Sequence, residues 1–256
     1  MLMENTLDFT IRLKDGSSTK RSVSVKRIFL ARHYDRDIEA TRAILDAKRA
    51  EGYSAHGNSS ICRKSRYLVT NEDVVEVQGP QTSGEVEIAA IMDRNEVLIS
   101  AGSDHCDRTL ETMWSAALGK IYDTAKIKQM APAVVAREAW KYDDVLDHWD
   151  QLILRSSITV DGRRIPYQEF KLTELVSLDH HLTNHPELRE DGSVLFAGSG
   201  NILSTVPSNV YQGQPSIQGL VFPSDFNFEL EDQVLRRKIV HSCTVLSIEK
   251  PRSISL

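Results

Sequence analysis

Residues 84–104 of the chain read GEVEIAAIMDRNEVLISAGSD, the most informative stretch of the sequence. Its first half predicts a strand on which Glu85 and Glu87 share one side, because strand side chains alternate. Residues 93–95 predict a turn, and a return strand leads to Asp104. The hairpin therefore gathers three carboxylates, which repel one another unless a cation compensates them. Such oxygen ligands are those that a hard divalent metal prefers.

A Glu-x-Glu strand more commonly has a solvated face, and that is the alternative interpretation. Residues 226–231 read FNFELE, whose clean alternation is typical of an ordinary half-exposed strand. The strand after Gly84 differs, because Ala89 and Ile91 continue the side that carries its two glutamates. Both sides are then apolar, so the glutamates point toward a buried region. Buried carboxylates need a partner, and this strand contains no Lys or Arg.

Size and composition narrow the class of protein. A chain of 256 residues suits one large domain, alone or with a small appendage. A net charge of −5 argues against nucleic acid and anionic membranes as partners. No apolar run approaches the roughly 18 residues of a membrane span. The mixed polarity of residues 1–10 does not resemble a signal peptide. Three separated cysteines indicate a reducing compartment, so we expect a cytoplasmic protein.

The remaining patterns predict a strand-rich mixed α+β fold with short peripheral helices. An irregular polar stretch at 53–66 and a loose segment at 207–223 interrupt it. Helices are expected at 35–51, 109–118 and 173–181, the last capped by Thr173. Strands are expected at 7–13, 23–30, 67–70, 74–77, 85–92, 96–101, 152–160, 164–170, 194–197, 226–230 and 239–248.

The ordered motifs of residues 84–246 resemble the fumarylacetoacetate hydrolase superfamily. That family's metal motif is a Glu-x-Glu strand followed by an Asp, which the three carboxylates match. The family has an Arg four residues after the Asp, where Arg108 stands. It has a Lys after the next helix, where Lys128 stands. A Gly-Thr-Pro turn has its counterpart at Gly198 and Ser199. The resemblance implies a metal site with Mg²⁺ or Mn²⁺ and a site for a small anionic substrate.

The resemblance also implies an architecture. It is a β-sandwich roll of the fumarylacetoacetate hydrolase type, assembled as a homodimer. Residues 76–256 would form the catalytic core, and residues 1–75 would supply N-terminal strands and a lid packed on that core. Asp107, close to Arg108, is grouped with Arg108, Gly198 and Ser199 as a substrate-binding residue.

One departure from the family concerns its lid motif Tyr-x-x-His-x-x-Glu, whose His-Glu pair activates water. Tyr34 matches, but Asp37 replaces the His and Ala40 replaces the Glu. His33, His56 and Asp37 remain as candidates for the general base, and residues 35–66 would form the lid. Loss of the pair weakens the case for hydrolysis but leaves the metal site intact.

The chemistry that these residues imply centres on an enolate. A metal ion acts as a Lewis acid toward a 2-oxo acid or 1,3-diketo acid such as an acylpyruvate. Arg108 would hold a carboxylate, Lys128 would stabilise the developing negative charge, and Ser199 would add a hydroxyl contact. We expect a metal-dependent hydrolase that cleaves a C–C bond. The alternatives are decarboxylation, dehydration or keto-enol tautomerisation, or a non-catalytic relative that binds metal and ligand.

Three further clusters have two interpretations each. His180, His181 and His185 form either a zinc site or a solvated polar turn. His105 is a catalytic candidate that either orients a metal ligand or is a loop histidine. The basic run at 63–66 is either solvated surface or part of a lid that attracts an anionic substrate.

Overall fold

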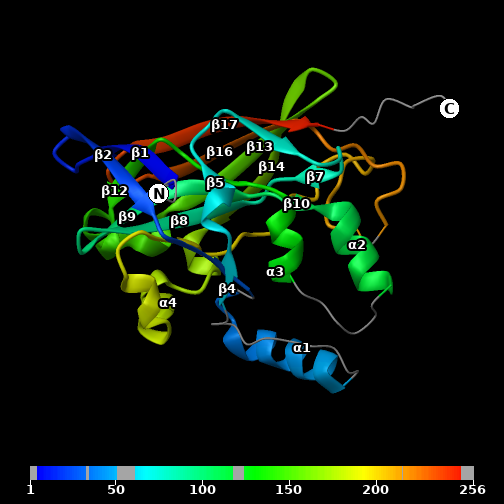
Figure 1. Cartoon of the computed structure of the whole chain (residues 1–256), viewed down its shortest axis with the longest axis horizontal. Helices are drawn as coiled ribbons and strands as arrows, with labels where there is room; N and C mark the ends of the chain where they lie inside the picture. Colours follow the sequence, from blue (N-terminus) through cyan, green and yellow to red (C-terminus); the bar gives the residue numbers. More distant parts are fainter. Residues whose placement is uncertain (1–4, 33–34, 51–60, 118–123, 215, 249–256) are drawn as a thin grey trace.

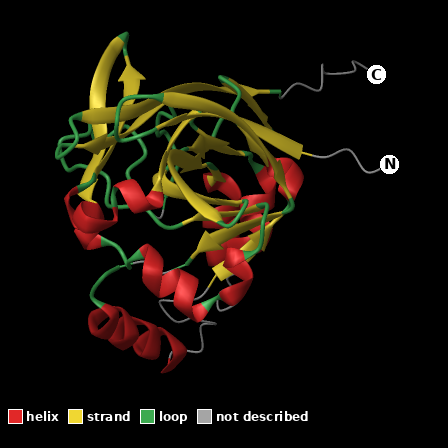
Figure 2. Ribbon diagram, turned by 90° about the vertical axis from the view of Figure 1, so that its left-hand side faces the viewer, coloured by secondary structure: helices red, strands yellow, loops and turns green. Residues whose placement is uncertain are grey.

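The computed structural model describes residues 5–32, 35–50, 61–117, 124–214 and 216–248. Its strands form a curled body, and the helices gather along one side of it (Figures 1 and 2). The α-helices are α1 (Ile38–Ala50), α2 (Arg108–Ala117), α3 (Thr124–Ile127) and α4 (Leu178–Asn184). Short 3-10 turns are η1 (Arg66–Leu68), η2 (Lys128–Met130), η3 (Tyr142–Asp144), η4 (Leu146–Gln151), η5 (Leu172–Glu174) and η6 (Pro186–Arg189).

The strands confirm the predicted strand-rich mixed α+β class. They are β1 (Asn5–Arg12), β2 (Ser18–Val25), β3 (Arg27–Ala31), β4 (Ile61–Lys64), β5 (Val69–Thr70), β6 (Val74–Val77), β7 (Thr82–Ser83), β8 (Val86–Asp93), β9 (Glu96–Asp104), β10 (Cys106–Asp107), β11 (Ala133–Val135), β12 (Glu138–Lys141), β13 (Ile153–Val160), β14 (Arg163–Lys171), β15 (Ser193–Phe196), β16 (Asp225–Asp232) and β17 (Arg237–Ser247).

Within the described residues these strands form three sheets. A 10-stranded sheet has the order β2-β1-β12-β9-β8-β15-β3-β4, with β11 and β5 attached beside β9. A 5-stranded sheet has the order β14-β13-β16-β17-β6, and β10 pairs with β7. The first five strands of the chain thus belong to the same sheet as β8 and β9. The division into residues 1–75 and 76–256 stays a prediction.

The β8–β9 hairpin forms as predicted. Asp93 pairs with Glu96, which leaves a two-residue turn. Both turn residues have positive φ, 53° at Arg94 and 61° at Asn95. Two consecutive left-handed residues give the turn geometry that matches the twist of the flanking strands.

Both faces of β8 are covered by hydrophobic core, also as predicted. Ile88 and Ala90 belong to the core that includes the inner side chains of the 5-stranded sheet. Ala89 and Ile91 belong to a second core, which the curled 10-stranded sheet encloses. Glu87 shares the second face by alternation and is only 5% exposed.

The edge of the 5-stranded sheet is irregular. β14 carries Pro166, and its pairing with β13 shifts register between Ser156 and Ser157. Two consecutive residues, Tyr167 and Gln168, are consequently both buried. β16, which β13 separates from this edge, alternates strictly between buried and half-buried residues, as its sequence predicted.

Two predicted elements differ from the structure. The first part of the expected helix at 173–181, residues 173–177, is instead the end of a 3-10 turn followed by extended chain, because Leu175 pairs with Asp35 in an isolated bridge. α4 starts later, where the Ser177 side chain accepts the backbone N–H of His180. The first two residues of the expected strand at 67–70 belong to the turn η1, and the last two form β5.

Two further findings concern the whole described chain. No helix among the described residues is long and apolar enough to span a membrane. The three cysteines, all within the described part, form no disulfide.

Candidate functional site

Glu85 and Asp104 face each other across the β8–β9 hairpin. Val86 pairs with Ser103, and the backbone N–H of Asp104 donates to the Glu85 carbonyl at 3.2 Å. Glu87 lies two residues further along, so its side chain leaves the same face. The structure therefore brings together Glu85, Glu87 and Asp104, hereafter the carboxylate cluster.

Cationic side chains from distant parts of the chain compensate this cluster. Lys128 Nζ lies 2.8 Å from Asp104 Oδ2 and 3.1 Å from Glu85 Oε2. Lys64 Nζ donates to Asp104 Oδ1 at 2.8 Å. Arg108 Nη2 donates to Glu85 Oε1 at 2.8 Å. The fold thus supplies the positive charge that the strand itself lacks.

The carboxylates of the cluster differ in electrostatic environment. Burial raises the pKa of Glu87, and the negative charge of Asp104 raises it further. Burial opposes ionisation of Asp104 as well, but the ammonium groups of Lys128 and Lys64 outweigh burial and lower its pKa. Asp104 therefore holds its charge between two cations. No Lys or Arg in the described part of the chain forms an ion pair with Glu87.

The loop after β15 reaches the cluster through its backbone. The N–H of Gly198 donates to Glu87 Oε2 at 2.8 Å. Gly198 has a φ of 106°, a conformation that favours glycine. The buried Ser199 hydroxyl accepts a hydrogen bond of 2.8 Å from Gln168 Nε2. Gly198 thus contacts a predicted metal ligand, and Ser199 is held by a residue that the sequence did not indicate.

Gln168 links several parts of the site. Its Oε1 accepts the backbone N–H of Val86 and the hydroxyl of Ser156, each at 3.0 Å. Its Nε2 also donates to the carbonyl of Gly200 at 2.8 Å. One buried amide therefore joins the start of β8, the strand β13 and the loop after β15.

Lys64 is the second residue that the sequence did not single out. It belongs to the basic run at 63–66, but its side chain is 0% exposed while Arg63 is exposed. The Gln129 side chain hydrogen-bonds to the backbone on both sides of Lys64. Gln129 Oε1 accepts the N–H of Ser65 at 3.0 Å, and Nε2 donates to the carbonyl of Arg63 at 3.3 Å. Gln129 directly follows Lys128, so both lysines are fixed against Asp104 together.

Arg108 has internal partners on each of its nitrogens. Besides Glu85, it donates from Nε to Ser83 Oγ at 2.7 Å and from Nη1 to Glu111 Oε2 at 2.8 Å. The Tyr211 ring lies against the guanidinium, 5.0 Å from its centroid. The structure shows that Arg108 orients Glu85. Its binding of a substrate carboxylate stays a prediction.

Two predicted aspartates cap helices. Asp107 Oδ1 accepts a backbone N–H in the first turn of α2 at 2.9 Å. Asp37 Oδ1 accepts one in the first turn of α1, also at 2.9 Å. Both contacts are ordinary N-caps. The remaining base candidates, His33 and His56, lie outside the described residues.

His105 is a core side chain. It is fully buried, and burial lowers its pKa to about 4. Its ring lies edge-on to Phe226 at 5.7 Å, and Nε2 lies 3.8 Å from Cys243 Sγ. Nδ1 lies 3.4 Å from the hydroxyl of Ser103. The neutral ring is engaged with the core, and these contacts give no support to a catalytic role.

The histidines around α4 do not form the alternative zinc site. His181 is fully buried, and neither of its ring nitrogens has a hydrogen-bond partner in the described structure. His180 lies beside it with ring centroids 6.2 Å apart, and His185 follows the last residue of α4. Across the described ranges, no three His, Cys, Asp or Glu side chains are arranged to hold a metal ion as they stand.

The carboxylate cluster nevertheless offers the oxygen ligands that hard divalent cations prefer, from three side chains on one face of the β8–β9 hairpin. The raised pKa of Glu87 is typical of a buried carboxylate that lacks a cation of its own. As the structure stands, cationic side chains occupy both oxygens of Asp104 and both oxygens of Glu85. The residues would fit a divalent cation only after at least one of these side chains moves.

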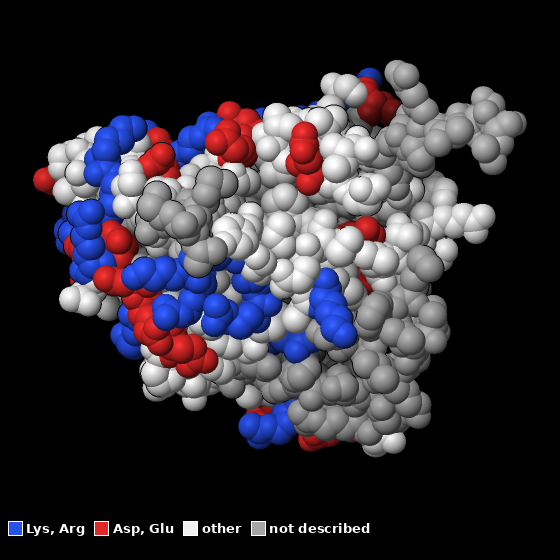
Figure 3. Space-filling model, in the orientation of Figure 1, with Lys and Arg blue, Asp and Glu red and all other residues white. Residues whose placement is uncertain are grey.

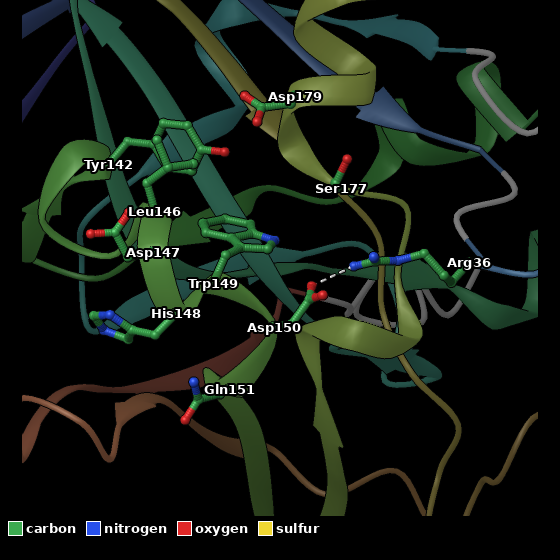
Figure 4. Close-up of a pocket in the computed structure, with 10 residues that line it drawn as sticks. All are labelled: Arg36, Tyr142, Leu146, Asp147, His148, Trp149, Asp150, Gln151, Ser177 and Asp179. Carbon is green, nitrogen blue, oxygen red and sulfur yellow. Dashed lines mark hydrogen bonds and ion pairs between the residues drawn. The ribbon is translucent and has the colours of Figure 1, made fainter.

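A surface hollow of about 240 Å³ lies elsewhere, between η3, η4 and the start of α4 (Figure 4). Tyr142 and Trp149 form part of its wall, edge to face at 5.2 Å. Arg36 spans one side and pairs with Asp150 at 2.7 Å. None of the predicted site residues lines this hollow, so it is separate from the carboxylate cluster.

The surface near β4 is basic. Lys and Arg side chains gather in a band across the middle of the face seen in Figure 3, near the position of β4 in Figure 1. The net charge of the whole chain is −5, so this band is a local feature.

Residues 54–243 match the DUF2848 family, described as proteins of unknown function, and the chain belongs to this family. No curated protein matches the sequence.

Solved structures share the fold. A 2-keto-3-deoxyarabinonate dehydratase superposes with a TM-score of 0.54 at 13% identity, over 90% of this chain and 77% of that one. A structure of 2-keto-3-deoxy-D-arabinonate dehydratase complexed with magnesium and 2,5-dioxopentanoate superposes with a TM-score of 0.52 at 13% identity. The match again covers 90% of this chain and 77% of that one. A yeast fumarylacetoacetate hydrolase family protein gives 0.52 at 11% identity, over 89% and 95% of the chains. The fold is therefore of the kind that the sequence motifs implied.

Proposed function

We propose that the protein is a divalent-metal-dependent enzyme that acts on a small 2-oxo acid or 1,3-diketo acid. The observation that carries the proposal is the carboxylate cluster on one hairpin, in which Glu87 and Asp104 are buried and Glu85 is 27% exposed, framed by Lys64, Lys128 and Arg108. The proposal is supported by a protein of similar fold, the dehydratase complexed with magnesium and the 2-oxo acid 2,5-dioxopentanoate. We retain the β-sandwich roll as the finer description of the fold.

Glu85, Glu87 and Asp104 would hold Mg²⁺ or Mn²⁺, which would supply Lewis acidity toward the oxo group. The chain's own residues would do the rest. Lys128, 7% exposed, places an ammonium group beside two of the ligands, where it would stabilise negative charge in an enolate-like transition state. Arg108 would keep Glu85 oriented, and Ser199 would offer its hydroxyl from the loop after β15.

Hydrolytic C–C cleavage is the first reaction in this proposal. Reactions that need only enolate stabilisation form the second candidate, namely dehydration, decarboxylation or tautomerisation. A specific observation favours them: Asp37 caps α1 and His105 packs in the core, so neither described base candidate is free to activate water. A dehydratase among the proteins of like fold agrees with this second candidate.

Turnover of a substrate panel tests the proposal. Acylpyruvates, oxaloacetate and 2-keto-3-deoxy sugar acids are incubated with wild type and with Glu87→Gln, with and without Mg²⁺. We expect metal-dependent turnover that Glu87→Gln abolishes, and the products identify the reaction. Metal binding without turnover of any compound would favour a non-catalytic ligand-binding protein.

The proposal includes a homodimer, which the family resemblance implies. Sedimentation of the purified protein tests it, and a monomer at micromolar concentration would overturn it.

A further inference from the structure

Both carboxylate oxygens of Asp104 are occupied by ammonium groups. Lys64 Nζ lies 2.8 Å from Oδ1, and Lys128 Nζ lies 2.8 Å from Oδ2. The side chains of Lys64 and Asp104 are 0% and 2% exposed, so water does not screen this pair. Lys128 has a second carboxylate partner, Glu85. Among the described residues, Lys64 pairs with Asp104 alone.

Lys64 is held in this position by backbone contacts as well as by charge. It is the last residue of β4, an end strand of the 10-stranded sheet, and it pairs with Ile28 of β3. Gln129 then bonds the backbone on both sides of it, at Arg63 and Ser65. The lysine therefore reaches Asp104 across the curled sheet from a fixed point.

A divalent cation and Lys64 cannot share Asp104 Oδ1. A cation bound by the carboxylate cluster would lie next to that oxygen, within a few ångströms of the ammonium group. Like charges at such a distance in a buried site repel strongly, since little water screens them. Lys128 differs, because its second partner Glu85 retains it near the site.

We propose that Lys64 is an internal competitor of the metal ion. It neutralises Asp104 while no cation is bound, and cation binding displaces it from Oδ1. The affinity of the carboxylate cluster for a divalent cation is therefore reduced by the strength of the Lys64–Asp104 pair. This inference rests on the proposed metal-dependent function and adds a residue that tunes it.

Calorimetric titration with Mn²⁺ tests the competition on three metal-stripped proteins: wild type, Lys64→Met and Lys141→Met. Methionine keeps the length of the lysine stem and removes its charge. Lys141 is a matched control, because it pairs with Glu96 at the opposite end of β9. We expect Lys64→Met to bind Mn²⁺ more tightly than wild type by roughly tenfold or more, a change of about 1.4 kcal/mol per tenfold step. Lys141→Met should match wild type.

The outcomes separate the two hypotheses. Affinities of wild type and Lys64→Met that agree within about twofold, or a weaker Lys64→Met, would overturn the competitor role and leave the metal site standing. No Mn²⁺ binding by any of the three proteins would remove the metal site, and with it both the proposed function and this inference.

A measurement on the wild type alone covers the case in which Lys64→Met does not fold. An amine-directed reagent is applied with and without Mn²⁺, and the labelling rates of individual lysines are read by mass spectrometry. We expect Mn²⁺ to speed the labelling of Lys64 relative to Lys141, because the released ammonium group is no longer paired. An unchanged rate for Lys64 at saturating Mn²⁺ would overturn the proposal.

Discussion

Gln168 Nε2 donates a hydrogen bond of 2.8 Å to Ser199 Oγ, and so joins β14 to the loop that meets the carboxylate cluster. The same side chain satisfies the backbone N–H of Val86 at the start of β8. We predict that Gln168→Leu lowers the free energy of unfolding by about 2 kcal/mol, because buried polar groups lose their partner. Urea denaturation measures the loss. The exposed Gln151→Leu serves as control, and equal stability of the two variants would contradict the prediction.

Arg108 gives a second stability prediction. Removing one member of a buried ion pair leaves an uncompensated charge, and the cost is typically several kcal/mol. We expect Arg108→Ala to lose about 2 kcal/mol, less than for a fully buried pair. Glu85 and Glu111 lose a partner, but their side chains are 27% and 25% exposed and Glu85 keeps Lys128. Arg137→Ala is the control, since its pair with Asp73 is largely exposed and should contribute little. Similar unfolding midpoints for the two variants would show that Arg108 is not needed to hold the cluster.

Lys128 gives a prediction about rate. An ammonium group that acts mainly on the transition state affects kcat and kcat/KM together. On any substrate that wild type turns over, we expect Lys128→Ala to lower kcat by roughly 10² or more. Lys126→Ala, two residues upstream and exposed, should retain normal kinetics. Near-normal kcat in Lys128→Ala would refute this role while leaving the metal site untouched.

His181 gives a prediction about pH. Burial lowers its pKa to about 4 in the folded protein, with smaller effects from the facing His180 and His185. Its ordinary pKa is 6.5, so between these values the unfolded chain binds a proton that the folded chain excludes. The free energy of unfolding therefore falls as pH decreases through this window, by up to about 1.4 kcal/mol per pKa unit.

The His181→Leu variant tests this sign. Unfolding free energies measured at about pH 7.5 and about pH 5 should differ less in His181→Leu than in wild type. His180→Leu, on the same helix but half-buried, should behave like wild type. If His181→Leu loses as much stability on acidification as wild type does, the buried ring is not the cause.

The sequence predicted the parts of the site that local patterns encode. The β8–β9 hairpin follows from alternation, from a turn at Arg94 and Asn95, and from apolar residues on both faces. Lys64 was not predictable in this way. Its neighbours Arg63 and Ser65 are exposed, and its partner is 40 residues away across a curled sheet. Only the curvature of that sheet brings β4 to the end of β9.

Gln168 shows a second reason why sequence patterns miss a site residue. In a regular strand, Tyr167 and Gln168 would point to opposite faces and one of them would be exposed. The register shift in β14 buries both. The predicted helix at 173–181 is wrong only in its first part, residues 173–177, and residues 178–181 belong to α4. Leu175 is held extended by its bridge to Asp35, a contact that the local sequence does not encode.

The irregular edge of the 5-stranded sheet also affects how copies of this protein meet. An end strand with regular hydrogen-bonding groups is a template on which a second chain adds its own strand, and fibrous aggregates grow by that route. β14 interrupts the template twice, because Pro166 has no N–H to donate and the register shift bends the strand beside it. Both interruptions oppose extension of the sheet past β14 by a continuous ladder between molecules, and so disfavour growth of aggregates along this edge.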